Sequence, residues 1–293
     1  MNLIDLPPSI RFSEPTPGFP LLHIDHPEVA GCIALHGAQV MQWTPRGQRP
    51  VLYMSPDSLL EQGKPIRCGI PICWPWFGPR ADAPQLPGHG FARLMQWTLD
   101  SAIEEDVGVM LRLSLTESPE SLALWPHAFR LQLTIAMGDT LWVALSMEHR
   151  GSEPVEITGA LHTYLSVGAI DQTTVLGLES ATYLDLLENQ ARKSQQGAVT
   201  FHGEVDRIYE SKGKLRVEDR AWAREIAVSN SGSAATVVWN PWIEKTKRLA
   251  DLPDEAYHGF LCIEAANAGA DIIRLQPGQK HTLAQTLGPV AAL

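Results

Sequence analysis

Alternation of apolar and polar residues over three successive segments constrains the fold of this chain more than any other feature of its sequence. In VMLRLSL (109–115), FRLQLTIAM (129–137) and LWVALSM (141–147), every second residue is a large apolar one. A period of two places these side chains on one face of an extended strand. Gly138 and Asp139 separate the last two segments and are typical of a tight hairpin turn. The three segments are therefore predicted to be successive antiparallel strands.

Shorter segments of the same kind predict strands along the rest of the chain, near residues 29–35, 39–44, 51–54, 155–167, 225–230, 235–239, 259–265 and 281–287. Only residues 56–62 and 243–251 are predicted to be helical, and both segments are short. Because strands do not alternate with long helices, a βαβ fold is disfavoured. No internal repeat or low-complexity linker divides the chain. We predict an all-β protein in which residues 1–293 form one large, mostly antiparallel β-sandwich domain with one or two short helices and long functional loops.

Composition narrows the range of partners. The chain is 44% hydrophobic and 19% charged, and its net charge is −10, which disfavours nucleic acid and anionic membranes as partners. The first twelve residues, MNLIDLPPSIRF, lack the basic and apolar regions of a secretory signal, and no run of 18 apolar residues could span a membrane. Four cysteines without a CxxC pair predict no structural zinc site. We expect a cytoplasmic protein with reduced thiols, and a monomer.

Residues 67–80, RCGIPICWPWFGPR, contain three prolines and two tryptophans between two arginines. This proline density excludes a helix and a central strand, so a rigid loop is predicted. Trp74 and Trp76 could pack in the core or could stack on a sugar ring; if an indole stacks, we assign that role to Trp74. Arg67 is the first residue of this loop, and Arg93 is the last residue of the next motif, LPGHGFAR. Guanidinium groups suit a carboxylate or a phosphate, although structural ion pairs are the commoner use of arginine.

Two predicted strands carry titratable residues in apolar surroundings. In GALHTYLSVG (159–168), His162 shares a face with Tyr164 and Ser166, and Thr163 lies on the opposite face. In GFLCIEAAN (259–267), Glu264 shares a face with Cys262. If such a carboxylate is buried, desolvation raises its pKa toward the range of a useful base. The alternatives are a solvated glutamate and a hydrogen-bonded core histidine. His89, between two glycines, is either a polar turn residue or a group to which a ligand can approach closely.

Taken together, these motifs resemble those of the glucose-6-phosphate 1-epimerase (hexose-6-phosphate mutarotase) family, which is part of the aldose 1-epimerase, or galactose mutarotase-like, superfamily. The matching segments run in order from about residue 65 to 267: RCGIPICWPWFGPR, LPGHGFARLMQW, LHTYLSVG, GEVDRIY, VVWNPWIEKTKRLADL and LCIEAAN. The resemblance implies a β-supersandwich fold, in agreement with the strand pattern. It also implies that the ligand is a phosphorylated sugar.

The resemblance further implies roles for individual residues. His162 would be the general acid that protonates the ring oxygen, and Glu264 would be the general base for the anomeric hydroxyl. His89 would be an auxiliary hydrogen-bond donor. Asp206 would bind a hydroxyl and orient the acid. Arg67 and Arg93 would hold the anionic group, which makes a 6-phosphate the expected ligand feature.

Two positions depart from the family motif, because Cys68 stands where glycine is common and Arg80 where histidine is common. Neither change removes a proposed catalytic group. The chemistry needs one acid and one base, so we expect no metal and no other cofactor. Two alternatives stay open: a carbohydrate-binding protein of the same fold without catalysis, and a metal-dependent isomerase with His89, His162 and Glu264 as ligands. No HxH or HExxH spacing favours the second alternative.

Overall fold

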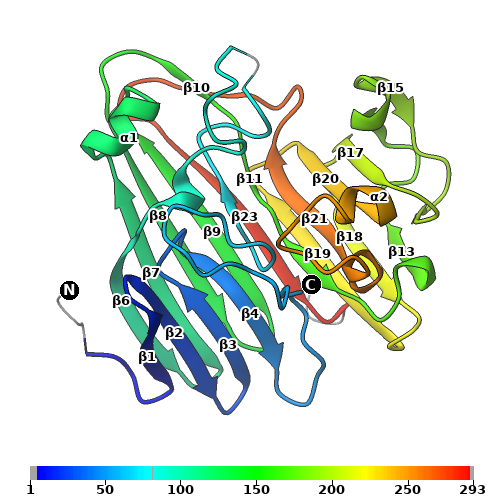
Figure 1. Cartoon of the computed structure of the whole chain (residues 1–293), viewed down its shortest axis with the longest axis horizontal. Coiled ribbons are helices and arrows are strands. Elements are labelled where there is room, and N and C mark those ends of the chain that lie inside the picture. Colours follow the sequence, from blue (N-terminus) through cyan, green and yellow to red (C-terminus); the bar gives the residue numbers. More distant parts are fainter. Residues whose placement is uncertain (1–4, 81, 291–293) are drawn as a thin grey trace.

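The fold is built from antiparallel β-sheets, shown in Figure 1. The structure, a computed structural model, describes residues 5–80 and 82–290. Residues 1–4, 81 and 291–293 lie outside the described part. Both ends of the predicted domain 1–293, and the first four residues of the leading segment MNLIDLPPSIRF, therefore lie outside it. That residues 1–293 form one domain stays a prediction. All pairs between named strands are antiparallel.

The strands form four sheets. The nine-stranded sheet has the order β16 (Val199–Thr200), β13 (Thr173–Leu176), β18 (Lys214–Asp219), β19 (Arg224–Ser231), β23 (Lys280–Gly288), β9 (Leu141–His149), β8 (Phe129–Met137), β7 (Gly108–Thr116) and β6 (Thr98–Glu105). The eight-stranded sheet has the order β15 (Ala191–Ser194), β14 (Thr182–Asp185), β17 (Val205–Glu210), β20 (Ala235–Asn240), β21 (Phe260–Asn267), β11 (Gly159–Leu161) and β5 (Ile72–Cys73), and β12 (Tyr164–Ser166) also pairs with β21. The smaller sheets are β1 (Ile10–Thr16), β2 (Phe19–His26), β3 (Val29–Ala34) and β4 (Gln39–Pro45), and the pair β10 (Val155–Ile157) and β22 (Ile273–Leu275).

Helices are few and short in the described residues. They comprise α1 (Pro119–Leu124), α2 (Trp242–Thr246) and the 3₁₀ turns η1 (Ala92–Leu94), η2 (Ile170–Gln172), η3 (Leu186–Glu188) and η4 (Ala256–Gly259). None of the helices described is long and apolar enough to cross a membrane.

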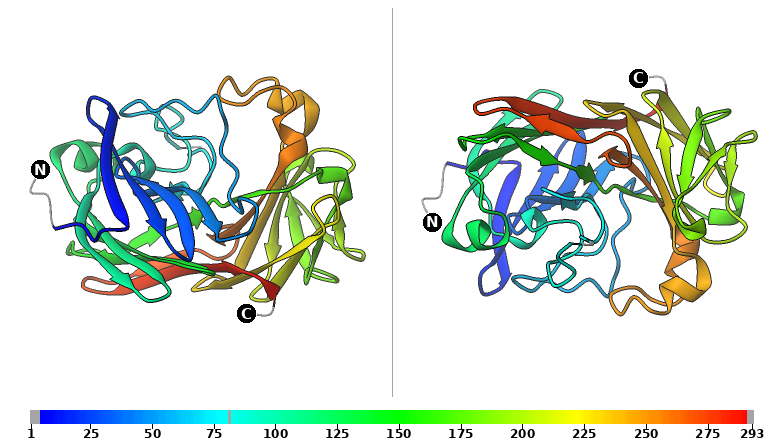
Figure 2. Two further views of the ribbon diagram at one scale, coloured as in Figure 1. Left: turned by 90° about the horizontal axis from the view of Figure 1, so that it is seen from below. Right: turned by 90° about the horizontal axis from the view of Figure 1, so that it is seen from above.

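The sheets stack in layers around the main core. Figure 2 shows β23 and β9 of the nine-stranded sheet on one side of the molecule and the blue strands β2–β4 on the other. Apolar side chains from both large sheets, such as Leu133 of β8, Leu283 of β23 and Ile263 of β21, form one buried cluster. A second cluster lies on the other face of the eight-stranded sheet and includes Cys262 and Val237. The central strand β21 is therefore buried on both faces, and its outer face carries the candidate site.

The strand predictions from alternation are confirmed where the pattern is strongest. Residues 109–115, 129–137 and 141–147 lie in β7, β8 and β9, and Met137 pairs with Leu141 across the predicted turn. The segment 155–167 is broken into three short strands, β10, β11 and β12. Residues 51–54 make only two isolated bridges, at Leu52 and Met54.

The helix predictions were less accurate. Residues 56–62 form turns and not a helix. Of its two leucines, Leu59 is exposed and Leu60 packs against a buried cluster, so the segment has no continuous apolar face that would stabilise so short a helix. The predicted helix 243–251 is real but ends at Thr246. The helix α1 was missed, although Ser118 followed by Pro119 is a recognisable start signal and forms a capping box with Ser121.

Candidate active site

Strand register brings His162 and Glu264 together. Leu161 of β11 pairs with Ala265, and Tyr164 of β12 pairs with Cys262. Both pairs belong to one continuous antiparallel register. His162 and Thr163 are the two residues between β11 and β12, and this register places His162 opposite Glu264. Alternation puts both side chains on the outer face of β21. The distance from His162 Nε2 to Glu264 Oε1 is 3.4 Å.

Both members of this pair are buried, and each has a polar atom without a partner. His162 is 8% exposed and Glu264 is 1% exposed. His162 Nδ1 and Glu264 Oε2 make no hydrogen bond within the described residues. Burial raises the pKa of the Glu264 carboxyl well above its ordinary value, and Asp206 adds to this effect. Burial, together with the nearby positive charges, lowers the pKa of the His162 imidazole well below its ordinary value. Unpaired, desolvated groups of this kind are typical of sites that a ligand completes.

His89 lies beside His162 on a strained turn. Its backbone is left-handed, with φ of 65°, and the next residue, Gly90, has φ of 73°. A bridge between Trp74 and Gly90 fixes this turn against the 67–80 loop. The rings of His89 and His162 are 5.7 Å apart. His89 Nδ1 accepts a hydrogen bond from the backbone N–H of Gly78. The neutral ring therefore carries its proton on Nε2, as a hydrogen-bond donor needs.

The electrostatic surroundings keep His89 neutral. Burial lowers the pKa of His89 to about 3, and the positive charges of Arg93 and Arg67 act in the same direction. The same two arginines lower the pKa of His162. The site thus has a positive potential although the whole chain is acidic.

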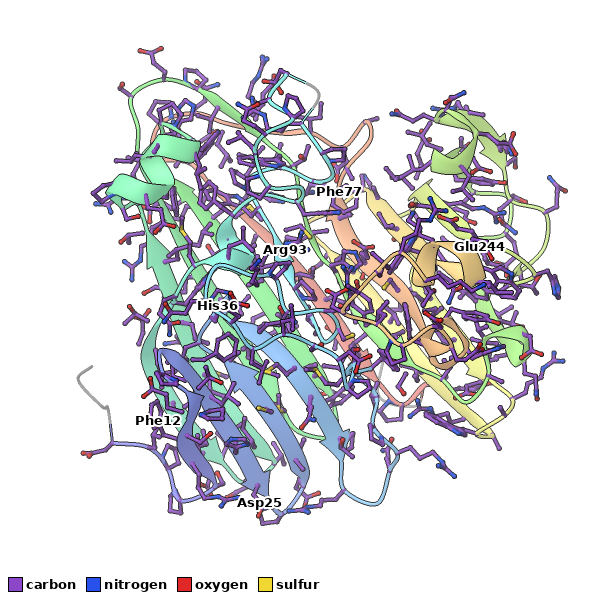
Figure 3. The ribbon with its side chains drawn as sticks, in the orientation of Figure 1. Phe12, Asp25, His36, Phe77, Arg93 and Glu244 are labelled. Carbon is purple, nitrogen blue, oxygen red and sulfur yellow. The ribbon has the colours of Figure 1, made fainter. Side chains whose placement is uncertain are left out.

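The two arginines are held in different ways. Arg67 Nε donates to Asp251 Oδ2 at 3.0 Å, and Arg67 Nη1 lies 3.5 Å from the Tyr164 hydroxyl oxygen. Arg93 Nη2 donates to the carbonyl oxygen of Gly88 at 2.9 Å, and its Nε is buried without a partner. Figure 3 shows Arg93 on the segment near the middle of the molecule. Arg67 is oriented by two contacts and Arg93 by one, and each guanidinium keeps further N–H groups for an anion.

Asp206 lies on the outer face of the same sheet but bonds to a lysine and not to His162. It stands in a cross-strand row with Trp239 of β20 and Cys262 of β21. Lys245 of α2 contacts Asp206 at 3.2 Å and Glu204 at 2.8 Å. Burial raises the pKa of Asp206. The structure therefore connects Asp206 to the site through its charge, which acts on Glu264, and gives no direct contact by which it would orient His162.

Trp74 lies in the core, which was the first of the two interpretations of the sequence. It is 2% exposed and packs against Phe91, Trp125 and Phe129. A ring that is this deeply buried offers no free face to a sugar, so the burial of Trp74 argues against its predicted stacking role. Its burial anchors the turn that carries His89. Trp76 is also buried and donates from its indole N–H to the Pro87 carbonyl oxygen.

The two departures from the family motif have different consequences. Cys68 has φ of 89°, a left-handed conformation that explains why glycine is common there. Its buried sulfur accepts a hydrogen bond from the Ser55 N–H. Arg80 pairs with Asp82 and lies over the Trp76 ring, so its charge is already engaged outside the His162–Glu264 pair.

Sequence reasoning missed three residues that contact the site. The Tyr164 ring stacks on His162 at 4.9 Å, with 12° between the planes. Asp251 pairs with Arg67, and Lys245 pairs with Asp206. All three stand in the motifs LHTYLSVG and VVWNPWIEKTKRLADL. Alternation placed Tyr164 on the face of His162 without giving it a role, and no spacing signal pairs Asp251 or Lys245 with partners so distant in sequence. Across 5–80 and 82–290, no group of three or more His, Cys, Asp or Glu side chains is arranged to hold a metal ion.

Similar architectures are known. The galactose mutarotase related enzyme of Lactobacillus acidophilus is 12% identical and superposes with a TM-score of 0.71 over 91% of this chain and 96% of its own. At that identity the likeness concerns the fold alone. With mostly antiparallel sheets and two short α-helices among its described residues, the protein has a galactose mutarotase-like β-supersandwich fold.

Sequence comparison gives the family. The profile of the family described as "Aldose 1-epimerase" matches residues 20–288, and the chain belongs to this family. A protein of Escherichia coli K12 named "Putative glucose-6-phosphate 1-epimerase" is 39% identical over 251 residues, which is 85% of this chain and 83% of that protein. The crystal structure of a "putative mutarotase (YeaD)" from Salmonella typhimurium is 32% identical and has a TM-score of 0.91, over 98% of this chain and 95% of its own.

Proposed function

We propose that the protein interconverts the α and β anomers of a hexose 6-phosphate, with glucose 6-phosphate as the expected substrate, and that it needs no cofactor. The observation that carries the proposal is the buried contact between His162 Nε2 and Glu264 Oε1, with one unpartnered polar atom on each side chain. Family membership and the names of the relatives support an isomerase acting on a sugar anomer.

In the proposed reaction, Glu264 removes the proton from the C1 hydroxyl group. The C1–O1 bond becomes a carbonyl double bond as the C1–O5 bond breaks, and its electron pair goes to O5. His162 gives a proton to O5, and His89 donates a hydrogen bond from Nε2 to the ring oxygen or a nearby hydroxyl. Rotation about C1–C2 exposes the other face of the aldehyde. Ring closure then reverses each proton transfer, so the two groups exchange roles.

One proton must be shared by the pair before substrate binds. Burial favours the neutral carboxyl and the neutral imidazole, so the proton rests on Glu264 in the empty site. Transfer of this proton to His162 gives the carboxylate and imidazolium that the proposed roles require. The substrate helps this transfer. Its phosphate offsets the positive potential of Arg67 and Arg93, which is one reason that the pKa of His162 is low.

The arginines would also give the preference for a phosphorylated sugar. Arg67 and Arg93 each have free N–H donors in a partly buried setting, where charge-assisted hydrogen bonds to phosphate are strongest. The net charge of −10 disfavours nucleic acid or an anionic membrane surface as a partner, and it is compatible with a small anionic ligand held by a local cluster of cations. We propose that the protein acts in the cytoplasm, as a monomer.

The test follows the approach of fresh α-glucose 6-phosphate to anomeric equilibrium by polarimetry or exchange NMR. The protein should accelerate it well above the spontaneous rate, and extensive chelation should leave this rate unchanged. Glu264→Gln and His162→Asn should each lose most of the acceleration while keeping the fold by circular dichroism. Full activity in both variants would refute the assignment.

A carbohydrate-binding protein of the same fold is the alternative. The positive site and the unpartnered polar atoms of His162 and Glu264 would serve binding as well. Saturable binding of glucose 6-phosphate in a titration, with only the spontaneous rate of mutarotation, would favour this alternative. Activity lost on chelation would instead favour the metal-dependent isomerase.

A further inference from the structure

A group of polar side chains is buried between the two large sheets, directly behind the His162–Glu264 pair. Gln285 of β23 is 2% exposed, although the residues on the same face of that strand, Leu283 and Leu287, belong to the main apolar core. Thr163 lies across from it, between β11 and β12, and is fully buried. A primary amide and a hydroxyl in such a core require partners for every polar atom.

The contacts satisfy these groups in a chain. Thr163 Oγ1 donates to Gln285 Oε1 at 2.5 Å. Gln285 Nε2 donates to the Ile263 carbonyl oxygen at 3.1 Å and to Asn230 Oδ1 at 3.0 Å. Asn230 Nδ2 in turn donates to Thr236 Oγ1 at 3.1 Å. We refer to Thr163, Gln285, Asn230 and Thr236 as the inter-sheet network. Each of its two amides uses both its oxygen and its nitrogen.

The network touches the chain neighbours of both proposed catalytic residues. Thr163 follows His162, and Ile263 precedes Glu264. One side chain, Gln285, therefore contacts both segments from the opposite sheet. The backbone also joins them, since the Ile263 N–H donates to the Thr163 carbonyl oxygen at 3.1 Å. Because neighbouring residues on a strand point to opposite faces, fixing Thr163 and Ile263 on the inner face fixes where His162 and Glu264 emerge on the outer face.

The location explains why polar groups are needed there. Named strand pairing is interrupted at His162 and Thr163, between β11 and β12. The register sets which residues lie opposite one another, but fewer strand hydrogen bonds hold their exact separation there. An apolar residue at 285 could fill the same space but would not select one arrangement of this break. A fully satisfied buried network can do so, because displacement leaves several polar groups unpaired at once.

We propose that Gln285 is a positioning residue: its amide bridges Thr163 and Ile263 and thereby sets the separation between His162 and Glu264. This inference rests on the proposed function, in which that separation controls proton transfer. Gln285 does not lie on the site face of the sheet and does not contact the substrate in this scheme.

The test replaces Gln285 by methionine, which is similar in size but has no amide. Misplacement of a catalytic group by about 1 Å can cost roughly 100-fold in rate. We therefore expect kcat in Gln285→Met to fall about 10- to 100-fold. KM should change little, because Arg67 and Arg93 are untouched. Thr236→Val is the matched control. Thr236→Val removes the acceptor of the Asn230 amide N–H, at the end of the network far from Thr163. It should lower stability without lowering kcat.

The result that overturns the proposal is a Gln285→Met variant that is folded and keeps the kcat of the original protein, or equal losses of kcat in both variants. If Gln285→Met does not fold, variants of Thr163 test the proposal instead. Thr163→Val removes the hydroxyl group and should lose kcat, whereas Thr163→Ser keeps it and should restore kcat. Equal kcat in these two variants would contradict the role.

An NMR measurement separates this proposal from the proposed function. The His162 imidazole signal, assigned by its loss in His162→Asn, reports the contact with Glu264 whether or not the protein is active. A changed chemical shift of this signal in Gln285→Met and an unchanged one in Thr236→Val support positioning even if the original protein shows no mutarotase activity. An unchanged chemical shift in Gln285→Met overturns it.

Discussion

Replacing Glu264 by glutamine should stabilise the fold at neutral pH while removing most of the activity. The carboxyl group is 1% exposed, and burial raises its pKa well above the ordinary value of 4.5. Glutamine has the same shape and no proton to lose. The variant therefore keeps the packing of β21 but avoids the cost of desolvating an ionisable group. Loss of a positioned base lowers the rate by about 10²–10⁴-fold.

The stability difference has a defined dependence on pH. Above pH 4.5 the unfolded chain loses the Glu264 proton, whereas the folded protein keeps it until the pH reaches the raised pKa. The original protein therefore loses stability relative to Glu264→Gln as the pH rises, by about 1.4 kcal/mol for each pH unit. The difference should therefore grow in favour of the variant as the pH rises from the ordinary pKa toward the raised one.

Urea unfolding of both proteins at a series of pH values measures this difference, because titrating groups that do not interact with Glu264 contribute equally and cancel. The slopes of free energy against urea should agree, so that midpoints can be compared directly. A difference that stays constant over this pH range would mean that Glu264 is ionised in the folded protein. The proton would then not rest on Glu264 in the empty site, and the account of the shared proton would be wrong.

Three further predictions concern the surroundings of this pair. Arg67→Met should weaken binding of glucose 6-phosphate by about 10- to 100-fold, the value of one charge-assisted hydrogen bond, and should leave binding of glucose unchanged in the same titration. Gly90→Ala should destabilise the protein far more than Gly47→Ala, as measured by urea unfolding. Both glycines have φ of 73°, but a Cβ at Gly90 would lie 2.0 Å from the Trp74 carbonyl oxygen and one at Gly47 would meet nothing within 4 Å. Equal losses would show that steric contact at Gly90 is relieved at no cost. The His89 imidazole should show no titration by NMR between about pH 4.5 and pH 8, since burial and the nearby arginines lower its pKa to about 3 and the ring is already neutral throughout. A titration in that range would contradict the neutral donor role.

The sequence predicted the long strands and the faces of β21 well, because alternation over nine residues, as in β8, is a direct record of which side chains are buried. The predictions failed for short elements, because one or two turn residues decide whether such a segment becomes helical. The segment 56–62 has a helix-like composition but forms turns, with Leu59 exposed and Leu60 packed against a buried cluster. The helix α1 is visible only through the local capping signal at Ser118.

For the candidate site, the residue types were predictable but their pairing was not. His162 and Glu264 are separated by about a hundred positions, and only the common register of β11 and β12 on β21 places them opposite one another. The family resemblance assigned their roles but gave neither the distance nor the unpartnered atoms. The inter-sheet network has no sequence signal, since Gln285 on an alternating strand is indistinguishable from a misplaced surface residue.

The burial of Trp74 changes the interpretation of the aromatic loop. A stacking platform would require an open indole face, but Trp74 is enclosed by aromatic rings, and its carbonyl oxygen accepts hydrogen bonds from the N–H groups of Phe91 and Ala92. The residue thus connects the core to the segment that carries both His89 and Arg93. Aromatic packing is worth several kcal/mol for a large buried ring, far more than a surface loop could obtain from its own hydrogen bonds. The rigidity of this loop therefore serves the site indirectly: the core fixes Trp74, Trp74 fixes the turn, and the turn holds a neutral histidine and a cation beside His162 before any substrate arrives.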